Sequence, residues 1–328
     1  MDFPGDVRLD ELGERGAIEV LKKVYDRGHP IGIGDDCGVV EWDGSYLLVT
    51  TDVLNARSHM PPGATPYQLG WYLVSVNLSD VAAMGGRPIG ILTALSLPRT
   101  TSLDYLRELA RGIEDCAKEF GIPVLGGDTK ESSEVSLAGT GLGKVAKDRI
   151  LLRRGAKAGD VLVVTGELGR AGLAYTQLKD PPRQKAALET LLRPYARVEE
   201  GKAFAESGAV TSCMDVSDGL GATLGEMAKQ SGVHFEVAWD RLPLPEDLQK
   251  LPFPDAKELA LYYGGDYELV ATVTPSKLAG LQKRLADSRH KMTVIGGVAE
   301  HGGNALHTPQ GTVTLEDRGW EHFRSGPP

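Results

Sequence analysis

Stretches of helical periodicity alternate with short apolar runs along the first half of the chain. Apolar residues three or four positions apart predict helices over 9–28, 66–86 and 101–121. Apolar runs of strand length predict strands over 46–52, 89–97, 122–128 and 134–145. Helices and strands mixed in this way favour an α+β domain, in which the helices pack on a sheet.

The sequence changes character over 147–160 (KDRILLRRGAKAGD), which is charged and rich in turn-forming residues. A chain of 328 residues is too long for one ordinary core and suits two domains. We therefore expect a boundary in this stretch, with one domain over 1–148 and a second over 149–328.

The second domain is also expected to be α+β. Residues 161–175 and 212–232 each predict a strand, a turn and a helix. Strands near 269–274 and 292–298 complete this domain, and 179–190 is expected to form a loop that leads into a polar helix.

Composition and charge exclude several classes of protein. Hydrophobic residues make up 41% and charged residues 25% of the chain, no apolar run is long enough to cross a membrane, and the N-terminus is too polar for a secretory signal. The net charge of −9, with no basic run, argues against nucleic-acid binding. Three cysteines without a CxxC spacing argue against a disulfide framework or a cysteine zinc site. We expect a cytoplasmic protein with no membrane or nucleic-acid partner.

Aspartates recur where apolar runs end. They are Asp36, Asp52, Asp128, Asp215 and Asp218. The stretch 31–40 (IGIGDDCGVV) even places Asp35 beside Asp36, although adjacent carboxylates repel one another. Turn formation and helix capping offer a purely structural explanation for each of these residues, and Asp218 could cap the helix that begins at Gly219.

Asp80 is harder to explain by turn chemistry. It shares the apolar stripe of its helix with Leu73 and Val76, and no Lys or Arg lies three or four positions away. An ion pair from elsewhere in the fold is one explanation, and a shared cation is the other. Several carboxylates with few local cations favour a hard divalent ion such as Mg²⁺.

Other recognised chemistries have weak or no signals. The glycine-rich loops could hold phosphates through backbone N–H groups, but GTGLGKV (139–145) lacks the spacing and the hydroxyl residue of a P-loop. No Gly-x-Ser-x-Gly or Cys/His arrangement indicates an acyl-transfer nucleophile. The residues alone predict a two-domain protein that binds several Mg²⁺ ions and a nucleotide.

The order of the motifs points to a family. They are GIGDDC (32–37), TTD (50–52), NLSDVAAMGGRP (77–88), GGDT (126–129), RRGAKAGD (153–160), DVSDGL (215–220), DYEL (266–269) and GWEHF (319–323). In this order and spacing the chain resembles the thiamine-monophosphate kinase family, within the aminoimidazole ribonucleotide synthetase-like ATP-binding superfamily. The resemblance covers roughly 9–323.

The resemblance implies a fold and a reaction. Two domains of the aminoimidazole ribonucleotide synthetase type are expected, with N-terminal sheets that pair in a homodimer and a C-terminal domain that completes each site. ATP and several Mg²⁺ ions would lie between the domains. The reaction implied is ATP plus thiamine monophosphate giving ADP plus thiamine diphosphate, by direct in-line phosphoryl transfer.

The resemblance also implies site residues. The metal-binding set is Asp36, Thr50, Thr51, Asp52, Asp80, Asp128, Asp215 and Asp218. The positions expected to hold ATP are Gly127, Asp128, Arg153 and Ser217, and the positions expected to contact thiamine monophosphate are His59 and Trp320. Arg153 and Asp218 are the expected catalytic residues.

The chain departs from the family pattern at the acceptor pocket. Gly265 stands where the family usually has a Glu near the substrate, Ser58 replaces an Asn, and Lys130 and Glu131 replace a Thr-Arg pair. A related ATP-dependent kinase or synthetase with another acceptor is therefore the alternative. Hydrogenase-maturation dehydratases and selenophosphate synthetases are disfavoured because this chain lacks their reactive cysteines, and an inactive nucleotide-binding protein is disfavoured by the intact aspartate set.

Overall fold

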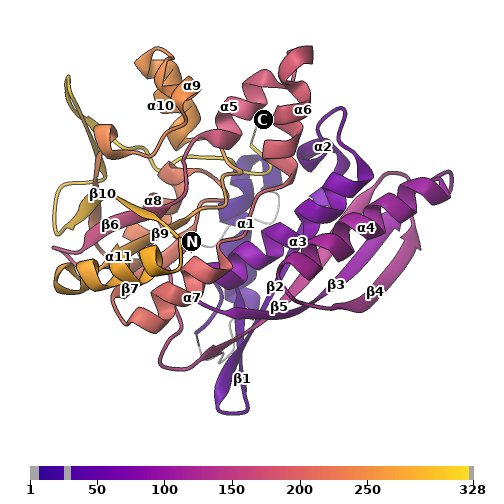
Figure 1. The fold of residues 1–328 in the computed structure, drawn as a ribbon, viewed down its shortest axis with the longest axis horizontal. Coiled ribbons are helices and arrows are strands. Elements are labelled where there is room, and N and C mark those ends of the chain that lie inside the picture. The colour runs from indigo at the N-terminus through magenta and orange to yellow at the C-terminus, as the bar shows by residue number, and fades with distance from the viewer. Residues whose placement is uncertain (1–6, 26–30, 325–328) are drawn as a thin grey trace.

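Two mixed β-sheets, one in each half of the chain, organise the fold (Figure 1). The computed structural model describes residues 7–25 and 31–324. The first sheet runs in the order β1-β2-β5-β3-β4. Its strands are β1 (Gly38–Trp42), β2 (Ser45–Asn55), β3 (Arg87–Leu97), β4 (Val124–Glu131) and β5 (Ser136–Ala146). All neighbours are antiparallel except β3 and β4.

Helices cover one face of the first sheet. They are α2 (Ala56–His59), α3 (Pro66–Ala83) and α4 (Leu103–Glu119). Helix α1 (Leu9–Tyr25) instead lies against the second half of the chain. A capping box of Thr65 and Gln68 begins α3, and the Ser102 hydroxyl caps α4. Alternate residues of β2, β3 and β5 pack against α3, whereas the residues between them are exposed or half-buried on a face that no described element covers.

The second sheet runs in the order β12-β11-β8-β10-β6-β9-β7. Its strands are β6 (Val161–Thr165), β7 (Val210–Asp215), β8 (His234–Ala238), β9 (Leu269–Val273), β10 (Met292–Ala299), β11 (Ala305–Thr308) and β12 (Gly311–Thr314). The helices of this half are α5 (Arg170–Gln177), α6 (Pro181–Leu192), α7 (Val198–Ser207), α8 (Leu220–Ser231), α9 (Glu246–Gln249), α10 (Phe253–Leu261) and α11 (Leu278–Asp287). Two short 3₁₀ turns, Trp239–Arg241 and Pro275–Lys277, complete the described elements.

Helix α3 lies between the two halves and is buried on nearly every side, not along one stripe. Its hydroxyl groups reach the second half of the chain. Ser75 donates to the Pro194 carbonyl at 2.6 Å, and the Tyr72 hydroxyl lies 2.7 Å from that of Tyr267. The single helical stripe expected from the sequence is therefore too narrow, because α3 packs on its sheet, on α4 and on the second half at the same time.

Glycines permit this close packing. A methyl group at Gly112 of α4 would lie 1.9 Å from the Tyr67 carbonyl oxygen of α3, and one at Gly70 would lie 2.2 Å from the Leu109 carbonyl oxygen. A methyl group at Gly201 of α7 would lie 2.1 Å from the Ala82 carbonyl oxygen. Backbones at such contacts leave no room for a side chain.

The predicted helices and strands are confirmed, with shifted bounds and one difference in type. Residues 181–192 form helix α6 directly, because Pro181 at its first position favours helix initiation. The predicted end of the first helix, at 26–28, lies outside the described residues. The apolar side chains of α1, including Ile18, Leu21 and Val24, are exposed.

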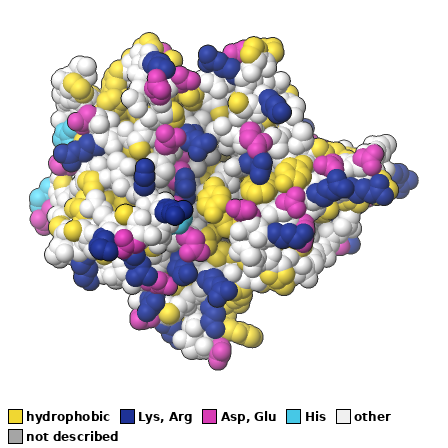
Figure 2. Space-filling view, in the orientation of Figure 1, with side chains coloured by type: hydrophobic (Ala, Val, Ile, Leu, Met, Phe, Trp, Pro, Cys, Tyr) yellow, Lys and Arg dark blue, Asp and Glu magenta, His cyan; other side chains and the backbone are white. Residues whose placement is uncertain are grey.

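Within the described ranges, no helix combines the length and apolar character needed to cross a membrane. On the face shown in Figure 2, Lys and Arg side chains lie interspersed with Asp and Glu side chains.

Substituting Gly112→Ala should lower the free energy of unfolding by about 1–3 kcal/mol, because the new methyl group would force α3 and α4 apart. Chemical denaturation measures this change. The matched control is Gly280→Ala in α11, where nothing lies near the added methyl group, and it should raise stability by up to about 1 kcal/mol. Equal effects of the two substitutions would refute the role given to Gly112.

Candidate functional site

Three loops of the second half meet beside α3. The Gly265 N–H donates to the Ser217 carbonyl at 2.8 Å, and the Trp320 N–H donates to the Asp218 carbonyl at 3.0 Å. A methyl group at Gly319 would lie 2.0 Å from the Asp218 carbonyl oxygen. These contacts fix Ser217, Asp218 and Trp320 relative to one another.

Helix α1 crosses over these loops and is tied to the C-terminal segment. The N–H of Glu14 donates to the His322 carbonyl at 3.2 Å, and the N–H of His322 donates to the Glu14 carboxylate at 3.0 Å. Arg15 forms an ion pair with Asp317 at 2.6 Å. Gly13 has a φ of 74° and kinks the helix at this crossing.

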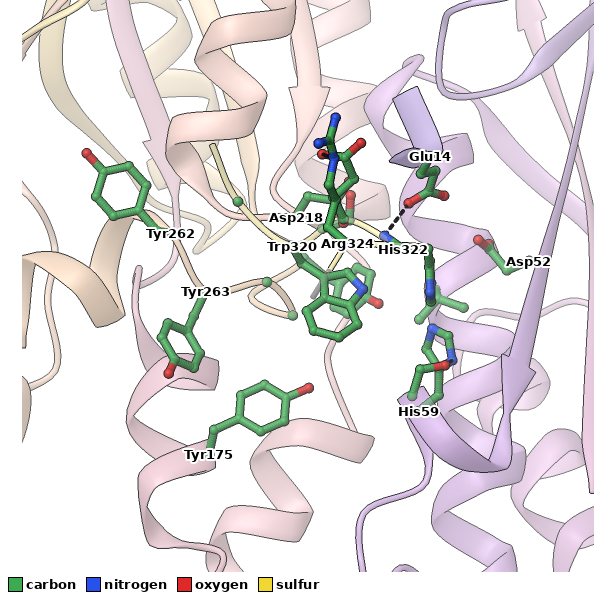
Figure 3. A pocket seen from close by; sticks show the side chains of 18 of the residues that line it. Glu14, Asp52, His59, Tyr175, Asp218, Tyr262, Tyr263, Trp320, His322 and Arg324 are labelled. Atoms are coloured by element: carbon green, nitrogen blue, oxygen red, sulfur yellow. Dashed lines mark hydrogen bonds and ion pairs between the residues drawn. The ribbon is translucent and has the colours of Figure 1, made fainter. Parts of the chain in front are cut away.

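A cavity of about 440 Å³ lies between these loops and α3 (Figure 3). His59 and Trp320, the two predicted acceptor contacts, both line it, together with Asp52, Asp80 and Asp218. The ring of His322 lies 5.4 Å from that of His59 and 5.7 Å from that of Trp320. The cavity therefore has aspartates on one side and a chain of aromatic rings on another.

Three aspartates from separate segments converge at this site. Carboxylate oxygens of Asp36, Asp80 and Asp215 all lie within 4.8 Å of one another. Asp36 precedes β1, Asp80 is on α3, and Asp215 ends β7. The Thr50 hydroxyl donates to Asp80 at 2.5 Å, and the Ser79 hydroxyl donates to Asp215 at 2.6 Å. We call Asp36, Asp80 and Asp215 the acid cluster.

Burial and mutual repulsion oppose ionisation of these carboxyl groups. Burial, followed by the charges of Asp52 and Asp215, raises the pKa of Asp80 well above its usual range. Burial and the charge of Asp36 raise the pKa of Asp215 to about 7. Burial raises the pKa of Asp52 to about 6, and burial with the charge of Glu14 raises that of Asp218 to about 7. Without a counter-ion the site is electrostatically unfavourable.

Arg153 supplies one positive charge. Its guanidinium lies 2.7 Å from Asp36 Oδ1, and its backbone N–H donates to Asp35 at 2.9 Å. Among the described residues, no ion pair reaches Asp80, so the ion-pair explanation for its inward position is not supported.

The donor atoms of this site fit Mg²⁺. Asp36 Oδ2 and Asp52 Oδ2 are buried and have no hydrogen-bond partner among the described residues. Buried carboxylate oxygens without partners are costly, and Mg²⁺ prefers oxygen ligands of this type. The acid cluster, with Asp52 beside it, could therefore hold a divalent cation.

A second cavity, of about 460 Å³, adjoins the first. Ser217, Asp218 and Trp320 line both cavities. The second cavity also holds Arg153 and a group of lysines, which are Lys22, Lys23 and Lys229. Two cavities thus meet at Asp218, and the second contains basic side chains as well as acidic ones.

Two residues of the predicted metal set point away from the acid cluster. Asp128 lies in the same cross-strand row as Val53, on the uncovered face of the first sheet, and its carboxylate pairs with Lys130 at 2.9 Å. Thr51 is exposed on that face too, and its hydroxyl donates to the Gly139 carbonyl at 2.7 Å. Thr50 and Asp52 instead face α3. One chain alone therefore does not bring Asp128 or the Thr51 hydroxyl to the cluster.

Gly127 has a structural reason to be glycine. A methyl group there would lie 1.7 Å from the Thr93 carbonyl oxygen of the neighbouring strand. Its predicted contact with ATP stays a prediction.

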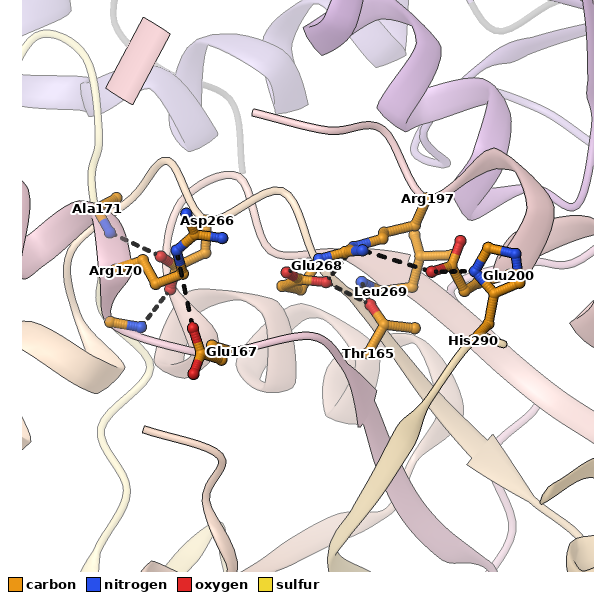
Figure 4. Close-up of polar contacts among 11 residues, drawn as sticks. Thr165, Glu167, Arg170, Ala171, Arg197, Glu200, Asp266, Glu268, Leu269 and His290 are labelled. Atoms are coloured by element: carbon orange, nitrogen blue, oxygen red, sulfur yellow. Dashed lines mark hydrogen bonds and ion pairs between the residues drawn. The ribbon is translucent and has the colours of Figure 1, made fainter. Parts of the chain in front are cut away.

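The DYEL motif has a structural role that the sequence did not indicate (Figure 4). Arg197 binds the Glu268 carboxylate through two nitrogens at 2.6 and 2.5 Å, and the Thr165 hydroxyl donates to Glu268 at 2.7 Å. Asp266 accepts the N–H groups of Gly169 and Ala171 at 2.6 and 2.9 Å and so holds the start of α5. Sequence reasoning also missed Glu14 and Tyr175, because no local pattern shows that they reach the cavity.

Both halves of the chain match one family of protein domains. Residues 34–145 match the N-terminal domain and residues 157–308 the C-terminal domain of AIR synthase related proteins. The predicted fold class is thereby confirmed.

Several proteins of similar sequence are named thiamine-monophosphate kinase. A "Thiamine-monophosphate kinase" of Pyrococcus horikoshii is 35% identical over 94% of this chain and 96% of its own length. One from Aquifex aeolicus is 34% identical over 97% of this chain and 100% of its own length. The solved structure "AaThiL complexed with AMPPCP and TMP" is 33% identical, covers 97% of this chain and 100% of its own, and has a TM-score of 0.84. Hydrogenase maturation protein HypE, at 20% identity and a TM-score of 0.69, shares the fold.

In the metal-free protein, the free energy of unfolding should fall as the pH rises from about 4 to about 7. The folded pKa values of Asp52, Asp215 and Asp218 exceed the unfolded value of about 3.9, so the folded state binds more protons across this window. Denaturation in EDTA at several pH values measures the slope. Added Mg²⁺ should restore stability at pH 7.5 and have little effect at pH 5. A stability that rises with pH across this window would contradict the account.

Asp80→Asn should raise the melting temperature in EDTA at pH 7.5 by about 2–4 °C, because it removes one of the repelling carboxyl groups. It should also abolish most of the stabilisation that Mg²⁺ gives to the wild type. Asp148→Asn, at an exposed position outside the site, serves as the control and should leave the melting temperature in EDTA unchanged. An Asp80→Asn protein that keeps the full Mg²⁺ response would rule out Asp80 as a ligand.

Proposed function

This chain belongs to the thiamine-monophosphate kinase family of AIR synthase related proteins, and we propose that it transfers a phosphoryl group from ATP to thiamine monophosphate. The pair of cavities that meet at Asp218 carries this proposal. The first contains His59 and Trp320, the predicted acceptor contacts, and the second contains the predicted ATP contact Arg153. Ser217, also a predicted ATP contact, lies where the two meet.

Phosphoryl transfer requires little covalent chemistry from the protein. An oxygen of the acceptor phosphate, already ionised at neutral pH, attacks the γ-phosphorus of ATP, and the bond from that phosphorus to the β–γ bridging oxygen breaks to release ADP. No general base is needed, which agrees with a site built from aspartates and one arginine. Substrates that enter from two cavities on either side of Asp218 would meet in line.

Charge is the main obstacle to this reaction. Two unit charges 4 Å apart interact by about 4 kcal/mol at an effective dielectric constant of 20. Arg153 stays charged at all accessible pH values, lies next to Asp36 and lines the second cavity. Its guanidinium would offset the charge that develops on the transferred group, in the catalytic role predicted for it.

The acid cluster would hold Mg²⁺, with Asp52 and Asp218 close enough to bind further ions. Mg²⁺ held there would supply positive charge that offsets the repulsion between the phosphates. Asp218, at the junction of the cavities, would help to hold such an ion, and Thr50 would hold Asp80 in position by its hydrogen bond.

His59 would act as a neutral hydrogen-bond donor. Burial, followed by the nearby His322, lowers the pKa of His59 to about 4, so the ring is uncharged at neutral pH. Its Nδ1 accepts the N–H of Asn55 at 3.2 Å, which leaves the proton on Nε2. Ser58, which replaces the usual Asn, lies 2.7 Å from the same Nδ1. The Nε2–H is then available to the acceptor.

The uncovered face of the first sheet supports the proposed homodimer. Val53, Leu92 and Ala94 are exposed side by side on this face, and Asp128 lies in the same row as Val53. Pairing of two such faces would bury these apolar residues and enclose Asp128 and Thr51 between subunits. This arrangement would allow both residues to contribute to a complete site.

A related ATP-dependent enzyme with another acceptor is the second candidate. Gly265 favours it, because the carboxylate expected to lie near the acceptor is missing.

The position of the domain boundary between 148 and 149 and a cytoplasmic location remain predictions.

Purified protein with ATP, Mg²⁺ and thiamine monophosphate should form ADP and thiamine diphosphate in equal amounts, because one phosphoryl group moves between them. Chromatographic quantification of both products measures this. Omission of Mg²⁺ should reduce turnover at least 100-fold, since the phosphates then approach a cluster of carboxylates without neutralisation. If thiamine monophosphate does not stimulate ADP formation but another phosphorylated metabolite does, the second candidate is correct.

A further inference from the structure

Aromatic rings from three segments line the first cavity, and one of them, that of Trp320, belongs to the residue that hydrogen-bonds to Asp218. Tyr175 comes from α5, Tyr263 follows α10, and Trp320 lies in the C-terminal segment (Figure 3). The rings of Tyr175 and Tyr263 lie 6.1 Å apart at 46°. All three side chains are half-buried and line the cavity, so a ligand in the cavity can contact them. Neither tyrosine hydroxyl has a hydrogen-bond partner in the part of the chain that the structure describes.

Among the described residues, the glutamates that line this cavity already have partners. The Glu321 carboxylate lies 3.7 Å from Arg324 and accepts the Arg15 N–H at 3.3 Å. Glu258 lines the cavity, but Arg318 binds it through two nitrogens at 2.7 and 2.6 Å. Gly265 has a φ of 107°, a conformation that side chains rarely adopt, so a Glu could not replace it without strain. Glu14 lies on the other side, close enough to Asp218 to raise its pKa, and its carboxylate accepts the His322 N–H.

We propose that Tyr175, Tyr263 and Trp320 form a cage that binds the positively charged ring system of the acceptor. This inference rests on the proposed function and specifies how that site recognises its substrate. The faces of aromatic rings carry negative electrostatic potential and bind quaternary nitrogen cations, most strongly where water is excluded. Thiamine monophosphate has such a cation, the thiazolium ring, and a phosphate at the opposite end.

The cavity has the matching polarity. Its aspartates, which would hold the cations, lie at one end and suit the acceptor phosphate, whereas Tyr175 and Tyr263 lie toward the other end and suit a flat cation (Figure 3). Trp320 lies between the two ends (Figure 3). Such a cage would bind the cationic ring in place of the Glu carboxylate that the family usually has at position 265. The departure at position 265 is then compatible with thiamine monophosphate as the acceptor, and the enzyme selects for a cationic ring.

Tyr175→Leu and Tyr263→Leu test the cage directly. Each should raise the KM for thiamine monophosphate about tenfold, equivalent to about 1.4 kcal/mol, and leave the KM for ATP within twofold. Tyr175→Phe and Tyr263→Phe keep the ring and should restore the KM to within about threefold of the wild type. Trp42→Leu removes an exposed aromatic ring on β1, far from the cavity lining, and should leave both KM values unchanged. Leucine variants with unchanged KM for the acceptor would overturn the proposal.

An uncharged analogue separates cation binding from simple apolar packing. Thiochrome monophosphate is the neutral, fluorescent oxidation product of the same acceptor, so its dissociation constant can be measured by fluorescence titration. The wild type should bind thiamine monophosphate at least tenfold more tightly than thiochrome monophosphate, and the Leu variants should lose this preference. An equal loss of affinity for both ligands would show that the rings only pack against the acceptor.

Glu14→Gln tests whether the Glu14 carboxylate, and not the aromatic cage, binds the cationic ring. It should change the affinity for thiamine monophosphate less than the Leu variants do, and the reverse order would refute the cage. Because the titrations measure binding without turnover, they give a result even if thiamine monophosphate is not phosphorylated. A wild type that binds the cation selectively but does not phosphorylate it would disprove the proposed function and leave the cage intact.

Discussion

The structure depends on bringing three carboxylates from distant parts of the chain into one buried site. Asp36, Asp80 and Asp215 repel one another within 4.8 Å, and burial removes the water that would weaken this repulsion. Hydrophobic packing must therefore hold them in place. Helix α3 does so, since it is buried on nearly every side and carries Asp80 at its end next to β2 and β7. The close helix contacts at Gly70, Gly112 and Gly201 make that burial possible.

The two halves of the chain divide the remaining tasks. The first half supplies Asp36, Thr50, Asp80 and His59, whereas the second half supplies Asp215, Asp218, Tyr175, Tyr263 and Trp320. Contacts that cross between the halves, such as the Ser79 hydroxyl on Asp215, join the packing of the core to the geometry of the site. The kinked helix α1 lies over the site and is held there by hydrogen bonds to the C-terminal segment. One end of the resulting cavity is suited to phosphate and the other to a flat cation.

Local pattern predicted many of the helices and strands, and the inward position of Asp80 alone suggested a shared cation. The other site residues were predicted from the family resemblance. The inward position of Asp80 without a nearby cation indicated an unusual environment, and the acid cluster now explains it. Contacts between distant segments were not predictable. The pairing register places Asp128 on the uncovered sheet face, Arg197 neutralises Glu268, and the loops bring Tyr175 opposite Tyr263. Each of these facts depends on residues far apart in the sequence, where periodicity gives no information.

The central claim is that the acid cluster binds divalent cations, and anomalous scattering from crystals grown with Mn²⁺ and a non-hydrolysable ATP analogue tests it most directly. Mn²⁺ accepts the same oxygen ligands as Mg²⁺ and can be located by its anomalous signal. The account predicts at least one strong peak in contact with Asp36, Asp80 and Asp215, next to the phosphates of the nucleotide. Peaks found only at exposed carboxylates, with the cluster occupied by water or by a protein cation, would contradict it.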